Sequence, residues 1–570
     1  MRARSTFLAA VTFLLVILAG MPVSANENGE YKYELKGDFA AITAYMGTAE
    51  EVIVPETLEG LPVTEIWQGA FRGNETLKRL KIPATVTYIG GNDSGDAGAF
   101  QDCTRLESVV LMPGQKDAII GFSAFKGCSS LRSINVPGNY KDICYQAFRG
   151  CILLENVKWE NGVYDFPNQT IGSGAFQGCT GLKSAELPGT VLTIQDNAFA
   201  DCTSLELLTL GEGTREIWQS AFSGCTSLKE VIIPSTVVYI GGNDSGDRGA
   251  FHGCTRLEKV QLKAGLEDAV IGYNCFRDCP SLQQIIVPGN YTAIQYHAFD
   301  GDISLKYVEW KKHDLIVAQQ NLGSGAFHGC TGLETVILPG TLKTIEDCVF
   351  EDCSSLSFLL LEEGLESIWQ SAFHNCTSLE EICIPSTVTY IGGNDSGDYG
   401  AFMGCKNLKR VFFLPGKQEA VIGHSAFKDC LSLGTVVIPG NYAGISYQAF
   451  RGDISLASVW YGSSGYAYQN QTIGDGAFDG CTALGSAALP DTLKEQAGNA
   501  FPAEQNIMFT TTSEIMSQEG LLEAQQAQQR IRETAESLRI PEEDTWTCSN
   551  GHAGNTGLFC PLCGEPKPEA

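Results

Sequence analysis

The sequence is poor in basic residues and in histidine. Its 570 residues include 38 Lys and Arg and seven His, against 66 Asp and Glu, for a formal net charge of −28. Nucleic acids and anionic membrane surfaces are bound through clustered Lys and Arg, so we expect neither as a partner. Hydrophobic residues make up 44% of the chain and charged residues 18%, a composition that excludes wholesale disorder.

The chain also lacks the residue constellations of catalysis. His252, His328 and His374 occupy a position that Arg, Lys, Gln, Ala, Ser or Met fills elsewhere in the sequence, so we interpret them as surface residues. No Ser, Cys or carboxylate stands at a recurring spacing from a His, and no phosphate-binding loop or dinucleotide fingerprint is present. We therefore expect a protein that is not an enzyme.

Long apolar segments are scarce as well. One run, from Phe7 to Met21, falls short of the ~20 residues that a membrane-spanning helix needs. Arg2 and Arg4 precede it and the small residue Ala25 follows, which is the pattern of a secretory signal peptide. We predict a signal peptide at 1–25, a secreted protein associated with the cell surface, and no membrane insertion once the signal is removed.

Glycine and cysteine, with 63 and 21 residues, are abundant, and both follow an internal repeat. An Ala-Phe pair or a near variant recurs in steps of 29, 25, 23, 28, 23 and 23 residues, which sum to 151, and the same series then begins again. This array predicts a repeat solenoid over 62–505, built as three blocks of 151 residues with the last incomplete, after an N-terminal cap and entry at 26–61. The repeated phenylalanines are Phe71, Phe100, Phe125, Phe148, Phe176, Phe199, Phe222, Phe251, Phe276, Phe299, Phe327, Phe350, Phe373, Phe402, Phe427, Phe450, Phe478 and Phe501.

Each unit carries the skeleton L-x-x-L-x-L. Counting from the repeated Phe as zero, apolar residues fall at +6, +9 and +11, as at Leu228, Val231 and Ile233 after Phe222. The alternation at +9 and +11 is typical of a short strand with one buried face. The run from Ala221 to Pro234 resembles the BspA-like branch of the leucine-rich repeat proteins, whose mark is A-F-x-G-C-x-x-L-x-x-V-x-[IL]-P.

The resemblance implies a leucine-rich-repeat β-solenoid or horseshoe of about 18 turns. It also implies a bacterial surface protein that adheres to host matrix or to other cells. We predict adhesion to matrix or cell-surface proteins, with the three blocks adding avidity. Two alternatives are a polysaccharide-binding surface protein and a structural surface component with no specific ligand.

Cysteine occupies position +3 in fourteen of the eighteen units, and Asn74, Asp302, Asp453 and Glu504 take the other four. One interpretation is a ladder of buried, unpaired thiols that bond to neighbouring backbone inside each turn. Disulfides between successive turns are the alternative, since the protein is expected to be exported.

Two sets of side chains are candidates for partner binding. Positions +8 and +10 face away from the core, and apolar residues there include Phe358, Leu360 and Phe412, which suit a protein partner. The other members of this stripe are Leu207, Ile232, Ile286, Ile337, Val437 and Trp460.

Three tryptophans form the second set. Trp67, Trp218 and Trp369 recur 151 residues apart and would suit sugar stacking or a protein hot spot, the alternative being a local cap over the turn. The loop Gly-Gly-Asn-Asp-Ser-Gly-Asp also recurs in each block and offers two carboxylates. Because two carboxylates lack the ligand count of a dedicated Ca²⁺ loop, we favour a solvated turn there over a calcium site. The carboxylate pairs are Asp93/Asp96, Asp244/Asp247 and Asp395/Asp398.

After Phe501 the repeat stops. Residues 506–540 predict a short helix, which caps the open end of the solenoid or serves as a linker. Residues 541–570 look like a small zinc ribbon, with Cys548, His552, Cys560 and Cys563 as the ligands of one structural zinc ion. A disulfide among these cysteines is the rival interpretation for an exported protein.

Overall fold

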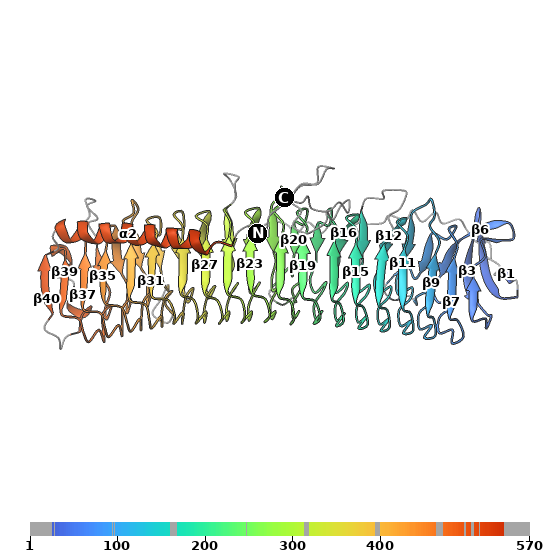
Figure 1. Ribbon diagram of the computed structural model, residues 1–570, viewed down its shortest axis with the longest axis horizontal. Coiled ribbons are helices and arrows are strands. Elements are labelled where there is room, and N and C mark those ends of the chain that lie inside the picture. Colours follow the sequence, from blue (N-terminus) through green and yellow to red (C-terminus); the bar gives the residue numbers. More distant parts are fainter. Residues whose placement is uncertain are drawn as a thin grey trace, which may run out of the picture.

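The computed structural model describes residues 26–540 apart from 28, 94, 96, 160–167, 245, 247, 313–318, 394–398, 463–470, 495–496, 503–506 and 512–513. The chain forms one elongated solenoid in which successive turns stack along the long axis (Figure 1). Each turn contributes one strand to each of two parallel-stranded surfaces, so the predicted repeat fold with short strands is confirmed.

One surface is a single sheet of 21 strands, which we call the long sheet. An antiparallel meander, β1 to β3, opens it, and from β3 onward neighbouring strands are parallel except for the β5–β6 hairpin. Its strands are β1 (Asn26–Glu27), β2 (Tyr31–Lys36), β3 (Phe39–Tyr45), β5 (Thr57–Leu58), β6 (Leu61–Trp67), β8 (Tyr88–Gly90), β10 (Ala118–Ile120), β12 (Tyr140–Ile143), β14 (Gln169–Ile171), β16 (Val191–Ile194), β18 (Glu216–Ile217), β20 (Tyr239–Ile240), β22 (Ala269–Ile271), β24 (Tyr291–Ile294), β26 (Gln320–Leu322), β28 (Leu342–Ile345), β30 (Ser367–Ile368), β32 (Tyr390–Ile391), β34 (Ala420–Ile422), β36 (Tyr442–Ile445) and β38 (Thr472–Ile473).

The other surface, which we call the opposite sheet, consists of four consecutive parallel sheets of seven, two, four and six strands. Positions +8 to +11 of each turn form these strands. They are β4 (Glu51–Ile53), β7 (Arg79–Ile82), β9 (Ser108–Leu111), β11 (Ser133–Val136), β13 (Asn156–Trp159), β15 (Ser184–Leu187) and β17 (Leu207–Leu210), then β19 (Glu230–Ile233) and β21 (Lys259–Leu262), then β23 (Gln284–Val287), β25 (Tyr307–Trp310), β27 (Thr335–Leu338) and β29 (Phe358–Leu361), then β31 (Glu381–Ile384), β33 (Arg410–Phe413), β35 (Thr435–Ile438), β37 (Ser458–Tyr461), β39 (Ser486–Leu489) and β40 (Met508–Thr511).

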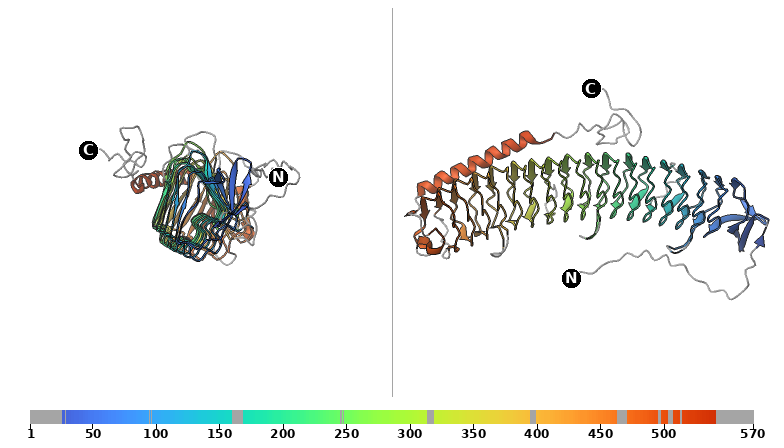
Figure 2. Two further views of the ribbon diagram at one scale, coloured as in Figure 1. Left: turned by 90° about the vertical axis from the view of Figure 1, so that its right-hand side faces the viewer. Right: turned by 90° about the horizontal axis from the view of Figure 1, so that it is seen from below.

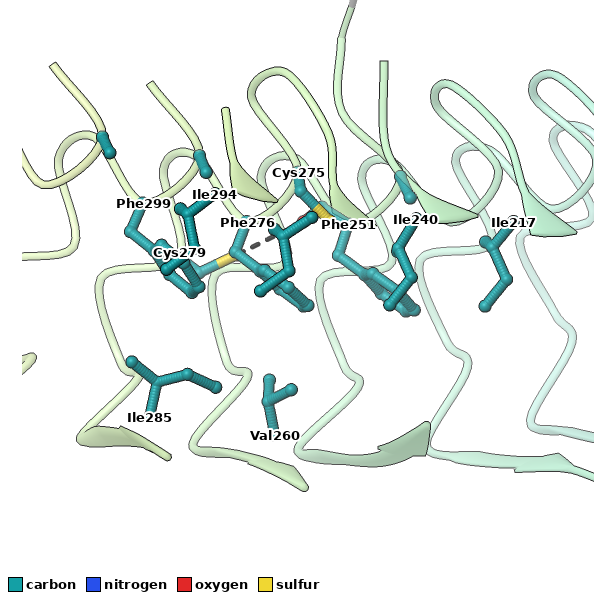
Figure 3. Close-up of a cluster of buried hydrophobic side chains, with 14 of the residues drawn as sticks. Ile217, Ile240, Phe251, Val260, Cys275, Phe276, Cys279, Ile285, Ile294 and Phe299 are labelled. Atoms are coloured by element: carbon teal, nitrogen blue, oxygen red, sulfur yellow. Dashed lines mark hydrogen bonds between the residues drawn. The ribbon is translucent and has the colours of Figure 1, made fainter. Parts of the chain in front are cut away.

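The repeated phenylalanines form one continuous stack through the core. All seventeen neighbouring pairs from Phe71 to Phe501 have ring centroids 4.6–5.4 Å apart and interplanar angles of 1–24°. Figure 3 shows three of them, Phe251, Phe276 and Phe299, between the two strand layers. Tyr45 stacks on Phe71 at one end, and Phe509 meets Phe501 edge-on at the other.

The cysteines at +3 form a second ladder beside the phenylalanines. Each of the fourteen thiols donates to the carbonyl oxygen of the Phe one turn earlier, with Sγ···O distances of 3.0–3.3 Å. Figure 3 shows one such bond, from Cys279 to the carbonyl of Phe251. All eighteen cysteines among the described residues are free, so the ladder of unpaired thiols is confirmed there and inter-turn disulfides are not found.

Charged residues at position +7 alternate in sign along the edge of the opposite sheet, from Lys78 to Glu258. Glu155 lies between Arg132 and Lys183 of the flanking turns, at 3.7 and 2.9 Å. Each such exposed pair adds little stability, but like charges at the same spacing would repel. The alternation therefore lets charged residues occupy position +7 in successive turns without repulsion between like charges.

Two of the +3 positions carry a buried carboxyl group instead of a thiol. Asp302 and Asp453 are fully buried, and one oxygen of each accepts the backbone N–H of the cysteine one turn earlier, at 2.7 and 2.8 Å. The other oxygen of each has no hydrogen-bond partner among the described residues. Burial raises the pKa of Asp453 well above its ordinary value, so the native state holds this group protonated over a wider pH range.

The chain ends its last turn with the short helices α1 (Asp491–Lys494) and η1 (Ala497–Asn499) and with strand β40, and helix α2 (Glu514–Leu538) follows. A helix is therefore present within the predicted segment 506–540. Among the described residues, no helix has both the length and the apolar character needed to cross a membrane.

We predict that the fourteen ladder thiols resist alkylation in the native protein. They are completely buried, and burial raises the pKa of thiols such as Cys225, so reactive thiolate is scarce. N-ethylmaleimide followed by mass spectrometry should find these cysteines unmodified without denaturant and modified in urea without reductant. Resistance that persists in urea and disappears only with reductant would show disulfides instead.

We predict that Asp453→Cys, which introduces the residue of the equivalent position Cys151, weakens the pH dependence of stability. Because the folded-state pKa of Asp453 is raised, folding takes up a proton above about pH 3.9 and stability falls as pH rises, by up to about 1.4 kcal/mol per pH unit. Urea unfolding between about pH 4 and 7 should give a flatter profile for this variant. Asp475→Asn, on an exposed side chain, is the control, and a profile unchanged by Asp453→Cys would contradict the prediction.

Candidate binding surfaces

Helix α2 lies along the opposite sheet and not over the end of the solenoid (Figures 1 and 2). Its side chains at 524, 527, 531 and 535 are buried in a cluster with sheet residues of β25 to β33. The helix turns back along the rod, so it does not form the cap over the open end that was one of the two alternatives for this segment. The sheet residues of this cluster are Tyr307, Ile337, Leu360, Cys383, Phe412 and Leu414, with Ile286 and Phe358 partly buried at its margin.

This arrangement corrects the sequence-based view of the apolar stripe. Leu360 and Phe412 are only 3% and 7% exposed, and Phe358 is partly buried against the same cluster. The three side chains leave the core as expected, but the chain's own helix covers them. They are not a free adhesive surface in this structure, and the expected threefold presentation of the sheet face does not hold.

Small side chains let α2 approach the sheet closely. Ala524, Ala527 and Ala535 face the sheet around Ile531. A Cβ atom placed on Gly520 would lie 2.5 Å from Cγ1 of Val437, so a larger residue there would have to displace that side chain. The helix is therefore shaped to this part of the opposite sheet.

Polar contacts fix the direction of α2. Gln528 donates to Glu363 at 3.2 Å, and Arg532 pairs with Glu362 at 3.4 Å. Near the helix end, Arg539 pairs with the buried carboxylate of Glu309 at 3.3 Å. The helix thus runs from the last turns back toward the middle of the solenoid, antiparallel to the progress of the repeats.

A comparison between the blocks of the sequence indicates which part of the opposite sheet the helix covers. From Ile337 onward, position +10 is apolar in seven consecutive turns, whereas one block earlier the same positions include Glu186, Thr209, Gln261 and Glu309. An apolar run confined to the last turns, next to an amphipathic helix, matches the footprint of α2. The seven residues are Ile337, Leu360, Cys383, Phe412, Val437, Trp460 and Ala488.

The first part of the opposite sheet has no such cover among the described residues. Val110, Leu207 and Ile232 are 50%, 53% and 38% exposed on β9, β17 and β19. Charged pairs lie on the same face, such as Arg79 with Glu51 and Lys259 with Glu230. We call β4 to β21 of the opposite sheet the open face, a mixed surface of apolar and charged side chains.

The three repeated tryptophans lie on the long sheet, away from the open face. The indole N–H of Trp67 donates to Glu65 at 2.6 Å, and that of Trp218 to Glu216 at 3.0 Å. Both rings are partly buried, whereas Trp369 is 36% exposed. The structure therefore does not bring the tryptophans together with the sheet-face residues.

The remaining predicted sites are described only in part. Asp93 and Asp244 each accept the backbone N–H two residues ahead, at 2.8 Å, which fits the favoured solvated turn. Their loop partners Asp96 and Asp247 lie outside the described residues, as do Asp395 and Asp398. The zinc ligands expected at Cys548, His552, Cys560 and Cys563, the signal peptide at 1–25 and Glu504 also lie outside them.

The histidines that the sequence indicated as surface residues are partly exposed, and each lies beside an acidic side chain. His328 lies 2.9 Å from one oxygen of Asp300, and His374 lies 2.9 Å from Glu351. His297 lies 2.7 Å from the other oxygen of Asp300. Burial acts to raise the pKa of Asp300, but hydrogen bonds with the two histidines outweigh it and hold that pKa below its usual range.

Stacked turns with L-x-x-L-x-L strands and an Asn or Cys ladder define a leucine-rich-repeat solenoid. The model of the BspA type leucine rich repeat region matches residues 48–170, 164–244, 320–457 and 463–518, and the chain belongs to this family. No curated protein matches the chain.

Solved structures resemble the chain at low identity. A leucine-rich repeat protein from Bacteroides ovatus is 22% identical, with coverage of 86% of this chain and 100% of that one and a TM-score of 0.44. A leucine rich cell surface protein from Faecalibacterium prausnitzii is 24% identical, with coverage of 69% and 96% and a TM-score of 0.35.

We predict that Ala527→Glu detaches α2, since a carboxylate would replace a buried methyl group against an apolar surface. The reporter is Cys383, which is 7% exposed beneath the helix and whose pKa burial raises to about 12. Alkylation of Cys383 should accelerate at least about tenfold, while Cys376 in the core ladder stays protected.

Gln526→Glu is the matched control for this experiment, because it adds the same charge on the exposed side of the helix. It should leave the alkylation rate of Cys383 unchanged. Equal rates for Ala527→Glu and the native sequence would show that α2 does not protect this thiol.

Proposed function

We propose that this protein is a secreted, non-enzymatic binding protein that adheres to matrix or cell-surface proteins through its open face. The observation that carries the proposal is the division of the opposite sheet into two parts. α2 covers the apolar row from Ile337 onward, whereas Val110, Leu207 and Ile232 are exposed on the open face. Membership of the BspA-type repeat family is consistent with a binding role.

The composition of the open face fits a protein partner. Exposed aliphatic side chains supply apolar area, and the charged pairs around them supply a polar rim, which is the usual anatomy of a protein interface. The face also extends over consecutive stacked strands, so it suits an extended partner.

The predicted sugar-binding role of Trp67, Trp218 and Trp369 has weaker support. A sugar ring would have to stack on a free face of the tryptophan ring. Lys36 already lies over the ring of Trp67, with its Nζ 5.0 Å from the ring centroid. The indole N–H groups of Trp67 and Trp218 are also engaged within the protein. Polysaccharide binding is therefore the second outcome of the test and not the proposal.

The test is retention of the secreted protein on immobilised matrix proteins and polysaccharides. We expect retention on protein, lowered at least about tenfold when Val110, Leu207 and Ile232 are all changed to Ser, because each substitution removes apolar area that a protein partner would bury. Exposed substitutions of this kind should leave the melting temperature nearly unchanged.

The matched control changes Trp67, Trp218 and Trp369 to Ala on the long sheet. Retention on protein should survive this change. Retention on polysaccharide alone, lost in the tryptophan variant, would replace the proposal with glycan binding. Retention on neither would leave the structural surface component as the better account.

The expected zinc ribbon at 541–570 remains a proposal of ours. Its support is the sequence spacing of Cys548, His552, Cys560 and Cys563. A bound zinc ion would be structural, since four protein ligands leave no coordination position open.

A further inference from the structure

The middle block carries a cluster of metal-ligating side chains that its sister blocks lack. His297, Asp300 and His328 come from two successive turns, and one ligand atom of each lies within 4.8 Å of the others. Both imidazole Nδ1 atoms meet the carboxylate of Asp300, at 2.7 Å for His297 and 2.9 Å for His328.

The equivalent positions in the other blocks show how specific this change is. In the first block they are Gln146, Arg149 and Gln177, and in the third block Gln448, Arg451 and Asp479. The middle block therefore has a ligating residue at all three positions, including a carboxylate where both sister blocks have an arginine. The surrounding core, by contrast, keeps the same phenylalanine stack in all three blocks.

We propose that His297, Asp300 and His328 form a binding site for a divalent transition-metal ion such as Zn²⁺. Two imidazole nitrogens and one carboxylate oxygen form a donor set that suits zinc, cobalt, nickel and copper better than magnesium or calcium. A metal ion binds imidazole through a nitrogen that carries no proton, so binding displaces any proton that His297 or His328 shares with Asp300. Three protein ligands leave at least one coordination position open to water or to another molecule.

The surroundings fit this site. The Asp300 side chain is only 11% exposed and those of His297 and His328 are 19% and 37% exposed, so the ligands sit at the surface but are partly shielded from water. His297 packs against Tyr296, with ring centroids 4.0 Å apart, which limits its rotation. Glu351 and Asp352 of the next turn add negative charge near His328.

Arg277 is the one cation in contact with the cluster among the described residues, 3.2 Å from the same Asp300 oxygen that meets His297. A carboxylate has about four lone-pair sites, so Arg277 and a metal ion can share this group. In that arrangement Arg277 orients the carboxylate, as outer hydrogen-bond partners commonly do at metal sites.

The test must separate this site from the tail cysteines, which are expected to bind zinc as well. We therefore place Cys560→Ser and Cys563→Ser in the full chain, strip it of metal, and titrate it with Zn²⁺ by calorimetry and with Co²⁺ by absorption spectroscopy. We expect one ion per chain and a Co²⁺ spectrum without a thiolate charge-transfer band, since the proposed ligands are nitrogen and oxygen.

The decisive variant is His297→Gln/Asp300→Arg/His328→Gln, which installs the residues of the first block and so keeps a set of side chains that the fold already accommodates. It should weaken binding at least about 100-fold. His374→Gln is the matched control, because His374 pairs with Glu351 without a second histidine, and it should bind as the parent does. Absence of a bound ion, or equal binding by the triple variant with retained helical and strand signals, would overturn the proposal.

Discussion

The structure depends on one packing requirement. Each side chain of a turn must pack against the side chain at the equivalent position of the next turn, about 5 Å away. Phenylalanine meets this requirement by stacking its rings, at centroid distances of 4.6–5.4 Å from Phe71 to Phe501. The thiols meet it by donating to the Phe carbonyl one turn earlier, and the charges at +7 meet it by alternating in sign. Asp302 and Asp453 show what this position demands of a residue other than cysteine. Each carboxyl group accepts a backbone N–H from the preceding turn, and burial raises the pKa of Asp453.

The outward position +10 is less constrained by its copies, and there the blocks differ. Position +10 is polar or mixed in the first part of the opposite sheet and apolar from Ile337 onward. An apolar row of this length is not left in water, and α2 covers it with alanines and Ile531. One repeat therefore supports two different surfaces: a closed face, on which the chain packs against itself, and an open face, which no other described part of the chain covers.

Much of the fold follows from the sequence because the information is local and repeated. The spacing of the phenylalanines, the alternation at +9 and +11 and the cysteines at +3 predict the stacked turns, the strands and the free thiols without any long-range knowledge. The position of α2 on the opposite sheet does not follow from such local information. Helical periodicity around Ala524 and Ile531 indicates an apolar side but not its target, and Leu360 lies more than 160 residues away. Only a comparison of position +10 between blocks distinguishes a covered row from an adhesive one.

The histidine cluster shows that a position of the repeat must be compared between adjacent turns before its role is inferred. Position +1 accepts many side chains, so His328 taken alone looks like a surface residue. Read along the stack, the same position runs Arg277, Asp300, His328, Glu351 and His374, an alternation of basic and acidic groups that the sister blocks do not contain. In a solenoid the neighbours of a residue are its copies in the adjacent turns, so chemistry arises between turns. The phenylalanine stack is the same in all three blocks although these columns differ, so near-identical blocks can present different side chains at their surfaces.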